Sequence, residues 1–537
     1  MKSIFKCMSF RLLVIIGLLI IANLASADVI YVNITAIGLN NGTSWTDAFT
    51  DLQNAINVAT PIDEIWVAQG TYLPTETQTD TFSRRKTFYI NKGMKLYGGF
   101  EGIPGTENDF TARDFATHPT ILSGDIGQEG VVEDNAYHVM WLDHVGFGLH
   151  IDGFRIVLGY GFDPGSGGTS GAGIYNDGSG TGSSSPFISN CTFDQDKSFE
   201  TAGAFFNFGS EAEAHPVLMN CVFTNNSGSG GGAITNMANP AGDASPVIIN
   251  CSFKGNSGPT AGGGAIQNIA LSAGSASPQL YNCLFTGNFS PNSAAFASFA
   301  SAGGVLTPLF INCTFSGNFG GGISTTALGG SIATPTVRNS IFWANSGGGG
   351  ISENGATTTV TYSLVPFGLF PGEGNVGLDP FFVNTPDFKS APTITGDVHL
   401  TEGSIAIDAG DNSALTIKDI PTDLDGHPRV FPENGTVDMG VYEFKTPTSG
   451  ITETALLSKW SIAPNPASNN FSINVESNSI GWMRMFDANG KLVFQKFLGS
   501  GITNESISAD HIPAGTYFMQ ILINGATSTR KLLIDKN

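Results

Sequence analysis

The sequence predicts an all-β protein: a right-handed parallel β-helix with three short strands per coil and an N-terminal helical cap, followed by a small C-terminal β-sandwich. The first observation is the motif Pro-x-x-x-Asn-Cys-x-Phe, which recurs with its five cysteines 30, 30, 32 and 30 residues apart. The second is composition, because 69 glycines and only 13% charged residues in 537 suit tight turns between short strands. A fixed period of this length indicates a solenoid whose units pack on their neighbours.

The pattern inside each unit indicates where the chain turns. An apolar residue lies two positions after the proline, and Cys and Phe follow three and five positions later. Side chains alternate with period two along a strand, so an offset of three requires a corner, and Asn tolerates the left-handed backbone there. The expected structural ladders are the corner asparagines Asn190, Asn220, Asn250, Asn282 and Asn312, and the inward-facing cysteines Cys191, Cys221, Cys251, Cys283 and Cys313.

The remainder of each unit supplies a third strand and a second corner. Gly-Gly-Ala-Ile at residues 231–234 and 263–266 begins the third strand, and a Phe-x-x-Asn ending marks the second corner. A leucine-rich repeat is excluded because its Leu pattern is absent, and a β-propeller needs about forty residues and four strands per blade.

The cysteines can be interpreted in two ways. Disulfides between repeats are one alternative for an exported chain. The number is odd, however, the same position recurs one coil apart, and a sixth copy of the motif replaces the cysteine with Ser340 without other change. Buried free thiols that act as small apolar side chains are therefore the favoured interpretation.

The first residues predict a secretory signal peptide. Lys2, Lys6 and Arg11 precede an apolar run over residues 12–22, and Ala25-Ser26-Ala27 is a small-residue cleavage pattern that makes Asp28 the first mature residue. The run is shorter than the roughly 20 apolar residues that span a bilayer, which argues against a membrane anchor. No other stretch is long and apolar enough, so no transmembrane segment is expected in the mature chain.

The expected domains follow from these patterns. They are a signal peptide at 1–27, the cap and irregular first coils at 28–150, the repeat coils at 151–396, a module closing the helix at 397–444, a linker at 445–459 and a β-sandwich at 460–537. An amphipathic stretch, Thr46 to Ala59, predicts the cap helix with Thr46 as its N-cap. Strands are expected at 64–68, 94–100 and 120–122.

Three segments resemble known families. The Gly-Gly-Ala-Ile and Phe-x-x-Asn tetrapeptides between about residues 150 and 350 look like repeats of polymorphic outer-membrane proteins and of the wider pectate-lyase-like β-helix group. Pieces at 404–410, 423–429 and 438–443 resemble the choice-of-anchor module. Residues 460–537, with Pro-Asn-Pro at 464–466 and Pro-Ala-Gly-Thr-Tyr at 513–517, resemble the C-terminal sorting domain of the type IX secretion system.

These resemblances imply a location and a partner. The sorting domain implies contact with the type IX secretion machinery and passage across the inner and outer membranes. The mature protein is then secreted or attached to the outer cell surface. The net charge of −21 argues against a nucleic-acid partner, whose phosphates this surface would repel.

Catalytic residues are not identifiable from the pattern. Lyases of the pectate-lyase-like group use acidic residues to bind calcium and a Lys or Arg as base, and related hydrolases use clustered Asp. Between residues 156 and 337 the only Lys or Arg residues are Lys197 and Lys254, and the single acidic cluster has the features of a solvated loop. That cluster comprises Asp194, Asp196 and Glu200. No catalytic, cofactor-binding or metal residue is assigned.

Calcium is the one cofactor that a motif suggests. Asp423-x-Asp425-Gly426 resembles half of a calcium loop but lacks the later ligands. Arg429 and Asp438 are instead expected to pair inside this turn-rich module.

The leading hypothesis is a non-enzymatic, adhesin-like surface scaffold that binds a polysaccharide or another host or environmental surface. Two loops inserted at the same place in successive coils, 237–245 and 269–277, are the expected contacts. The alternative is a polysaccharide lyase or glycoside hydrolase acting from a non-repeated loop.

Overall fold

The computed structural model describes residues 27–77, 83–105, 110–162, 170–260, 262–347, 350–366, 370–415, 422–430, 435–445, 460–477, 481–487, 492–498, 501–509, 511–523 and 526–536. The predicted signal peptide up to residue 26 and most of the predicted linker lie outside these residues. The chain divides into two compact units, Met1–Phe444 and Lys445–Asn537. No helix in the described ranges has the length and apolar character needed to cross a membrane.

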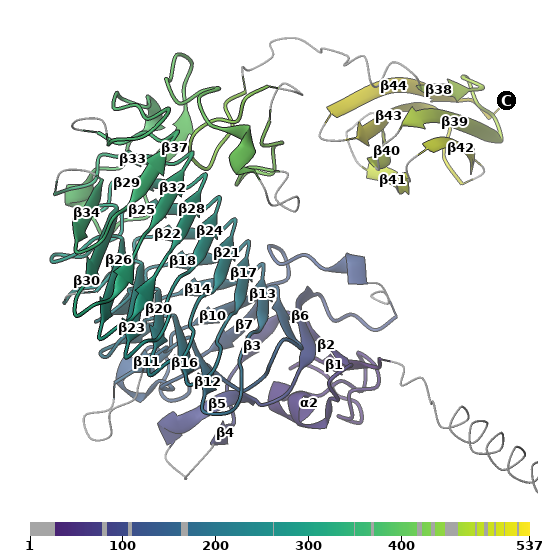
Figure 1. Ribbon diagram of the computed structural model, residues 1–537. Coiled ribbons are helices and arrows are strands. Elements are labelled where there is room, and N and C mark those ends of the chain that lie inside the picture. Colours follow the sequence, from purple (N-terminus) through teal and green to yellow (C-terminus); the bar gives the residue numbers. More distant parts are fainter. Residues whose placement is uncertain are drawn as a thin grey trace, which may run out of the picture. The chain divides into compact units, whose positions relative to one another are not determined.

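The first unit is a solenoid of three long sheets, in which the strands of successive coils pair in parallel (Figure 1). Sheet 1 contains β1 (Val29–Val32), β2 (Glu64–Ala68), β6 (Met94–Phe100), β9 (Leu149–Asp152), β13 (Phe187–Ser189), β17 (Val217–Met219), β21 (Val247–Ile249), β24 (Gln279–Tyr281), β28 (Leu309–Ile311), β32 (Thr336–Arg338) and β35 (Thr359–Thr361). Sheet 2 contains β3 (Gly70–Tyr72), β7 (Thr120–Ser123), β10 (Phe154–Val157), β14 (Thr192–Asp194), β18 (Val222–Thr224), β22 (Ser252–Lys254), β25 (Leu284–Thr286), β29 (Thr314–Ser316) and β33 (Ile341–Trp343).

Sheet 3 begins with an antiparallel pair and continues in parallel. It contains β4 (Glu76–Thr77), β5 (Lys86–Ile90), β8 (Met140–Asp143), β12 (Ile174–Ser179), β16 (Phe205–Ser210), β20 (Ile234–Ala238), β23 (Ile266–Leu271), β26 (Phe296–Ser301), β30 (Ile323–Ala327) and β34 (Ile351–Asn354). Short pairings at the corners involve β11 (Tyr160–Gly161), β15 (Lys197–Ser198), β19 (Ser227–Gly228), β27 (Val305–Leu306) and β31 (Ile332–Ala333). The predicted β-helix with three strands per coil is confirmed.

The core is built from ladders of identical side chains, as the repeat requires. The motif phenylalanines pair in register from coil to coil, and the ring of Phe253 lies parallel to Phe223 and Phe285 at 4.8 and 4.7 Å. Burying apolar surface in this way between coils supplies most of the stabilisation that a single coil lacks. The stack runs without a break from Phe193 to Phe342.

The asparagines at the first corner adopt the left-handed conformation. Their φ values lie at 52, 54, 52, 51 and 55° for Asn190, Asn220, Asn250, Asn282 and Asn312. Asn220 donates its side-chain amide to Asn190 Oδ1, and Asn282 donates to Asn250 Oδ1, each at 3.1 Å. The side chains of neighbouring coils are thus joined along the axis.

The asparagines at the second corner point inward and are fully buried. Asn256 Nδ2 donates to the Phe223 carbonyl at 2.9 Å and to Asn288 Oδ1 at 3.0 Å, while its own Oδ1 accepts from Asn226. A third ladder, which the sequence analysis missed, lies on sheet 3 and joins Asn176, Asn207, Asn236 and Asn268. Every buried amide in these ladders has a partner, as burial of a polar group demands.

The predicted helical cap is present but shorter than expected. Helix α2 (Leu52–Val58) packs Leu52, Ala55 and Ile56 against the apolar end of the core. Its N-cap is Asp51, whose side chain accepts from the Gln53 amide at 2.8 Å, so the prediction of Thr46 as N-cap is wrong. The reason is that Phe49 forms a parallel bridge with Val32, in which its amide donates to the Tyr31 carbonyl and its carbonyl accepts from Asn33, so the residues before Asp51 are not helical.

The predicted module at 397–444 lies on the flank of the solenoid. Its β37 (Asp397–Leu400) pairs antiparallel with β36 (Phe382–Asn384), and Met439 and Val441 pack on outward side chains of sheet 2. Corner asparagines anchor it, since Asn282 donates to the Thr422 carbonyl at 2.8 Å and Asn339 to that of Asp411 at 3.0 Å.

The end of the core is contacted instead by Val365 and Phe370, from a segment that precedes this module. Residues 397–444 were expected to close the helix, but in the described residues they pack on the outside of sheet 2. The outward side chains of sheet 2 are apolar at this point, and they hold the module on the side of the coils.

The five repeat cysteines are buried free thiols. Each sulfur faces a main-chain carbonyl, as Cys251 does toward Ile249 at 3.2 Å, and burial raises the pKa of Cys251 and Cys283 well above the ordinary value. Ser340 replaces the sixth cysteine and accepts from the Cys313 amide at 3.1 Å, as Cys251 accepts from Cys221 at 3.4 Å.

We expect denatured mature protein to titrate close to five thiols and native protein almost none, because the folded protein buries all five thiols away from the reagent. Titration with an aromatic disulfide reagent before and after denaturation measures this. Disulfide-linked peptides from neighbouring repeats in a non-reducing digest would contradict it.

The second unit is a β-sandwich, as predicted. One sheet has the order β38 (Trp460–Ala463), β39 (Asn470–Ser477) and β42 (Gly501–Ser508), and the other has β41 (Leu492–Leu498), β40 (Gly481–Asp487), β43 (Gly515–Ile523) and β44 (Ala526–Ile534). All pairs are antiparallel, and both sheets contribute to one core that includes Phe471, Ile473, Met483 and Met519.

Candidate functional site

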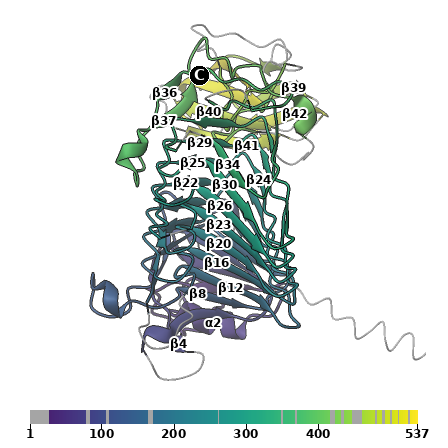
Figure 2. The same ribbon diagram turned by 60° about the vertical axis from the view of Figure 1, so that its left-hand side comes forward.

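The outer face of sheet 3 carries the most distinctive arrangement of side chains on the solenoid. Figure 2 looks onto the stacked strands of this sheet from β8 to β34. Alternation along each strand sends one set of residues into the core and the next set outward. Because the strands are in register, outward residues of successive coils form rows that run along the solenoid axis.

The first row is aromatic. Tyr89, Trp141, Tyr175 and Phe206 are paired in register on β5, β8, β12 and β16. The ring centroids of Trp141 and Tyr175 are 4.6 Å apart, and those of Tyr175 and Phe206 are 5.2 Å apart. Phe206 is buried, whereas the other three are partly exposed. We call these four residues the aromatic row.

Buried His138 supports this row from one side. Its ring meets Trp141 and Tyr175 edge-on, with centroids at 5.4 and 5.5 Å, and its Nδ1 lies 3.0 Å from the Gly171 carbonyl. Burial lowers the pKa of His138 to about 4, so the ring is neutral at physiological pH. A neutral, fixed ring holds the two exposed aromatics in place without adding charge.

The second row is apolar; it begins on β16, where the first row ends, and continues along the axis two residues further along each strand. Phe208, Met237, Ile269 and Phe299 are partly exposed and paired in register on β16, β20, β23 and β26. Phe208 joins the two rows, since its ring centroid is 5.8 Å from that of Phe206 on the same strand. We call these four residues the apolar row.

Two carboxylates border the aromatic row. Asp143 and Asp177 occupy equivalent positions on β8 and β12, two residues after Trp141 and Tyr175. Asp143 Oδ2 accepts from the Tyr89 hydroxyl at 2.5 Å. Burial, followed by this hydrogen bond and charge, raises the pKa of Tyr89 to about 12.

His144 lies next to the first of these carboxylates. Its Nδ1 contacts Asp143 Oδ1, and its Nε2 lies 2.6 Å from the Ser179 carbonyl. Burial alone would lower the pKa of His144, but these two acceptors outweigh it and raise the pKa. The edge of the row thus combines hydrogen-bond acceptors with a titratable imidazole.

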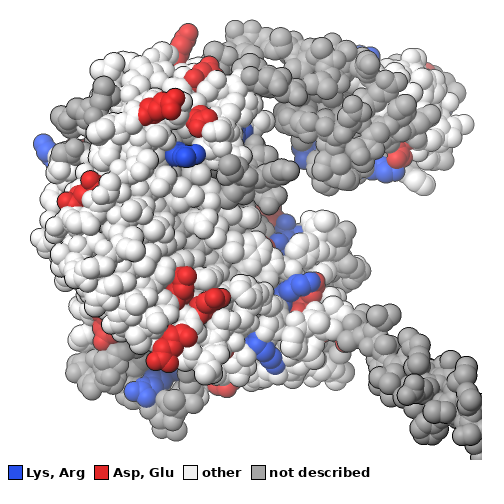
Figure 3. Space-filling model, viewed as in Figure 1, with Lys and Arg blue, Asp and Glu red and all other residues white. Residues whose placement is uncertain are grey.

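Among the strands that carry the two rows, only β5 contains a Lys or Arg, which is Lys86 at its first position. In the fully described strands β8, β12, β16, β20, β23, β26 and β30 there is no Lys or Arg, and Asp143 and Asp177 are the only acids. Figure 3 shows how sparse Lys and Arg are on the visible face of the solenoid. The outer face of sheet 3 therefore suits a ligand that offers apolar surface and hydroxyl groups rather than a polyanion.

The acidic cluster that the sequence analysis interpreted as a solvated loop is only partly solvated. Asp194 Oδ1 accepts from Thr224 and Asn225, whereas Asp196 is fully buried at the start of the inner asparagine ladder. Lys197 lies over the rings of Tyr160 and Phe199 at 5.8 and 5.2 Å. The three carboxylates are not brought together.

The two loops expected to contact a ligand, 237–245 and 269–277, lie mostly at the corners of the coils. Met237 and Ile269 lie on the outer face of sheet 3, where they belong to the apolar row, and Leu271 is a further outward residue at the end of β23. The remainder forms compact corners that stack small side chains such as Ala238, Ala244 and Ala270.

The half calcium loop is committed to main-chain hydrogen bonds. Asp423 Oδ1 accepts from the amides of Asp425 and His427 at 3.0 and 2.7 Å, and Oδ2 accepts from Glu443 at 3.0 Å. Across the described part of the chain, no group of three or more His, Cys, Asp or Glu side chains could hold a metal ion.

The predicted contact between Arg429 and Asp438 is present as a hydrogen bond from Arg429 Nη2 to the Asp438 main-chain carbonyl at 3.2 Å, but the ion pair of Arg429 involves a different carboxylate. Arg429 Nη2 lies 3.1 Å from Glu443 Oε1, while the Asp438 carboxylate accepts from the amides of Asp408 and Phe444. Burial raises the pKa of Glu443 to about 8 against the effect of Arg429. This network is interior and supports the module.

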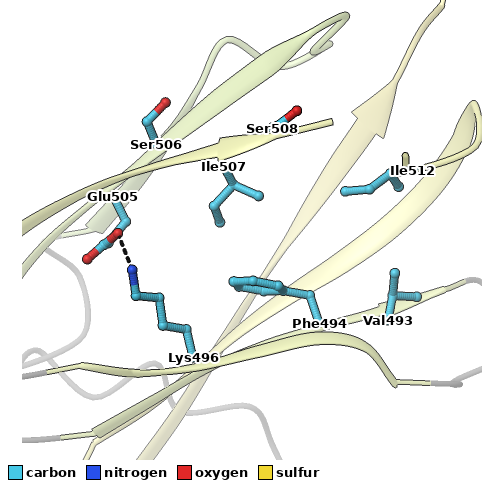
Figure 4. Close-up of a pocket in the computed structure, with 8 residues that line it drawn as sticks. All are labelled: Val493, Phe494, Lys496, Glu505, Ser506, Ile507, Ser508 and Ile512. Carbon is cyan, nitrogen blue, oxygen red and sulfur yellow. Dashed lines mark hydrogen bonds and ion pairs between the residues drawn. The ribbon is translucent and has the colours of Figure 1, made fainter. Parts of the chain in front are cut away.

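A groove of about 370 Å³ lies in the β-sandwich, between the edge strands β41 and β42 (Figure 4). Phe494, Ile507 and Ile512 form its apolar wall, and Lys496 Nζ bridges to Glu505 Oε2 at 2.7 Å. Charged residues that face inward on edge strands oppose pairing with other chains. The groove therefore belongs to the architecture of this unit.

Comparisons with known proteins agree with these two units. Residues 172–365 match the family model of the right-handed β-helix region, and residues 461–535 match that of the secretion system C-terminal sorting domain. The solved structure of pectate lyase Pel9A is similar over 78% of this chain and 97% of that chain, with 12% identity and a TM-score of 0.38. No curated protein sequence matches the chain.

The predicted right-handed β-helix and secretion sorting domain are thus confirmed. The sorting domain shows that the protein is directed to a secretion system. The signal peptide, and the resemblances to polymorphic outer-membrane protein repeats and to the choice-of-anchor module, stay predictions.

Proposed function

We propose that the protein is a secreted or surface-attached scaffold that binds polysaccharide through the outer face of sheet 3. The observation that carries this proposal is the aromatic row, whose partly exposed rings lie on successive coils beside two carboxylates. Sugar rings have apolar C–H faces that stack on aromatic side chains, and their hydroxyl groups donate to carboxylates. Large amphipathic rings with fixed positions make favourable binding anchors.

Two further features support this proposal. The anchors lie on strands rather than on loops, so little conformational entropy is lost when a ligand binds. The rows extend along the solenoid axis over several coils, which suits a polymer better than a small molecule. The sorting domain would place this face where extracellular polysaccharides occur.

We expect Trp141→Ala to weaken polysaccharide binding about thirtyfold, because truncating an aromatic anchor costs about 2 kcal/mol. Affinity electrophoresis of the mature protein in gels containing a panel of soluble polysaccharides measures the change. Phe187→Ala is the matched control, since Phe187 is a partly exposed aromatic on sheet 1 and stacks on His150 at 4.5 Å. Equal effects of the two variants, or no retardation by any polysaccharide, would contradict the proposal.

A glycoside hydrolase is the second candidate, and the adjacent carboxylates Asp143 and Asp177 favour it. Such enzymes use two carboxylates that flank the scissile bond. A lyase is less well supported, because the strands that carry these carboxylates, β8 and β12, contain no Lys or Arg to act as base. Release of reducing ends from a bound polysaccharide, abolished in Asp143→Asn, would establish hydrolysis in place of simple binding.

A further inference from the structure

We infer that the polysaccharide recognised by sheet 3 is uncharged and extended, and that it lies along the solenoid axis with about one sugar residue per coil. This inference rests on the proposed function and specifies its ligand. It is carried by the direction of the two rows and by the charge of the residues that border them.

The direction of the ligand follows from the register of the strands. The aromatic and apolar rows cross β5, β8, β12, β16, β20, β23 and β26 at right angles to the strands. Neighbouring strands are about 4.8 Å apart. This distance is comparable to the advance per residue of an extended β-linked pyranose chain, so successive rings can meet successive coils.

The charge of the ligand follows from the residues along both rows. Asp143 and Asp177 border the aromatic row, and the corners that follow β16 and β20 add Glu211, Glu213 and Asp243. His215 is the basic partner there, at 3.2 Å from Asp243, and His144 contacts Asp143. Uronic-acid polymers would meet these carboxylates with like charge, whereas a neutral chain would not.

Two basic residues, Arg84 and Lys86, shortly precede Tyr89, the first residue of the aromatic row. Arg84 is held by other contacts, and Lys86 lies at the start of its strand. Arg84 donates to the carbonyls of Asn135, Tyr160 and Phe162 and lies over the Tyr137 ring at 4.2 Å. Lys86 is at the first position of β5, three residues before Tyr89. No row of cations therefore follows the path of the ligand in the strands from β8 to β30.

The test compares polymers that share a backbone and differ in charge. Mature protein is run in affinity gels with hydroxyethyl cellulose or carboxymethyl cellulose, and likewise with fully methyl-esterified polygalacturonate or unesterified polygalacturonate. We expect the neutral polymer of each pair to bind at least about tenfold more tightly at low ionic strength, and the difference to shrink with added salt as repulsion is screened. Asp177→Asn should narrow the difference by improving binding of the anionic polymer.

A length series tests the orientation. Trp141→Ala and Phe299→Ala lie toward opposite ends of the two rows, so long neutral oligosaccharides should lose affinity in both variants, and short ones in only one. Tighter binding of the anionic polymers would overturn the inference and leave polysaccharide binding intact. Loss of affinity that does not depend on oligosaccharide length would overturn the axial orientation, and no binding of any polymer would overturn the proposed function as well.

Discussion

Replacing Phe253 with alanine is expected to lower the free energy of unfolding of the solenoid by about 3–5 kcal/mol. The ring is fully buried and lies parallel to Phe223 at 4.8 Å and Phe285 at 4.7 Å. Its removal leaves a cavity that the rigid stack on either side cannot close. Two stacked aromatic contacts are lost in addition to the transfer free energy of the side chain.

The same substitution at Phe342 is expected to cost about 1 kcal/mol less, because one stacked contact is lost rather than two. Phe342 is equally buried but stacks only on Phe315, at 4.8 Å. Urea unfolding followed by circular dichroism measures both variants. Phe253→Leu is the control, since it retains most of the apolar volume and should lose less stability. Equal losses of stability at positions 253 and 342 would contradict the prediction, because they would show that the second stacked contact of Phe253 does not contribute to stability.

The repeat made this part of the fold predictable. The motif recurs with an apolar residue, a Cys or Ser, and a Phe at its three inward positions, so one unit indicates the environment of the equivalent residues in the others. Strand boundaries at Glu64–Ala68 and Met94–Phe100 agree with the prediction even outside the repeat, because both segments are apolar and bounded by turns.

The aromatic row could not be predicted because no period marks it. Tyr89, Trp141 and Tyr175 come from coils of unequal length, so their distances along the sequence are uneven. The available signal was the outward position in each sheet-3 strand, one residue after the inward Ile or Phe, as in Ile174-Tyr175 and Phe205-Phe206. Reading that position across β5, β8, β12 and β16 would have revealed Tyr89, Trp141, Tyr175 and Phe206 where a solvent-facing strand usually has polar residues.

The module at 397–444 shows a different limit of the sequence. Its motif residues are recognisable, but their docking on the corner asparagines Asn282 and Asn339 depends on tertiary contacts that no local pattern specifies. The partner of Arg429 was also unpredictable, because Glu443 and Asp438 are both acidic and only the backbone geometry separates their roles.

The inner asparagine ladder leads to the second prediction with a large effect. Asn256→Asp is expected to cost about 2–6 kcal/mol at neutral pH, because the Phe223 carbonyl and Asn288 Oδ1 each lose a buried donor at about 1–3 kcal/mol. The ladder begins, however, with a natural aspartate. Asp196 Oδ1 accepts from the Gly159 amide at 2.9 Å, whereas its buried Oδ2 has no hydrogen-bond partner among the described residues.

The converse change, Asp196→Asn, is therefore expected to stabilise the solenoid by about 1–3 kcal/mol near pH 8, because an amide nitrogen replaces the unpartnered oxygen. Burial raises the pKa of Asp196 well above its ordinary value, so the folded protein retains this proton where the unfolded chain has lost it. The natural protein then loses stability as pH rises above the unfolded pKa of about 4, until the folded pKa is reached. The asparagine variant lacks this loss.

The difference in unfolding free energy between Asp196→Asn and the natural protein should accordingly grow as pH is raised from about 5 to 8. Urea unfolding at several pH values measures it. Glu443, whose pKa is raised to about 8, contributes the same pH dependence to both proteins and cancels in the difference. Asn256→Asp should behave in the opposite way to Asp196→Asn: its unfolding free energy should fall further below that of the natural protein as pH rises. A pH-independent difference for both variants would mean that Asp196 is ionised in the folded protein and that its second oxygen has found a donor.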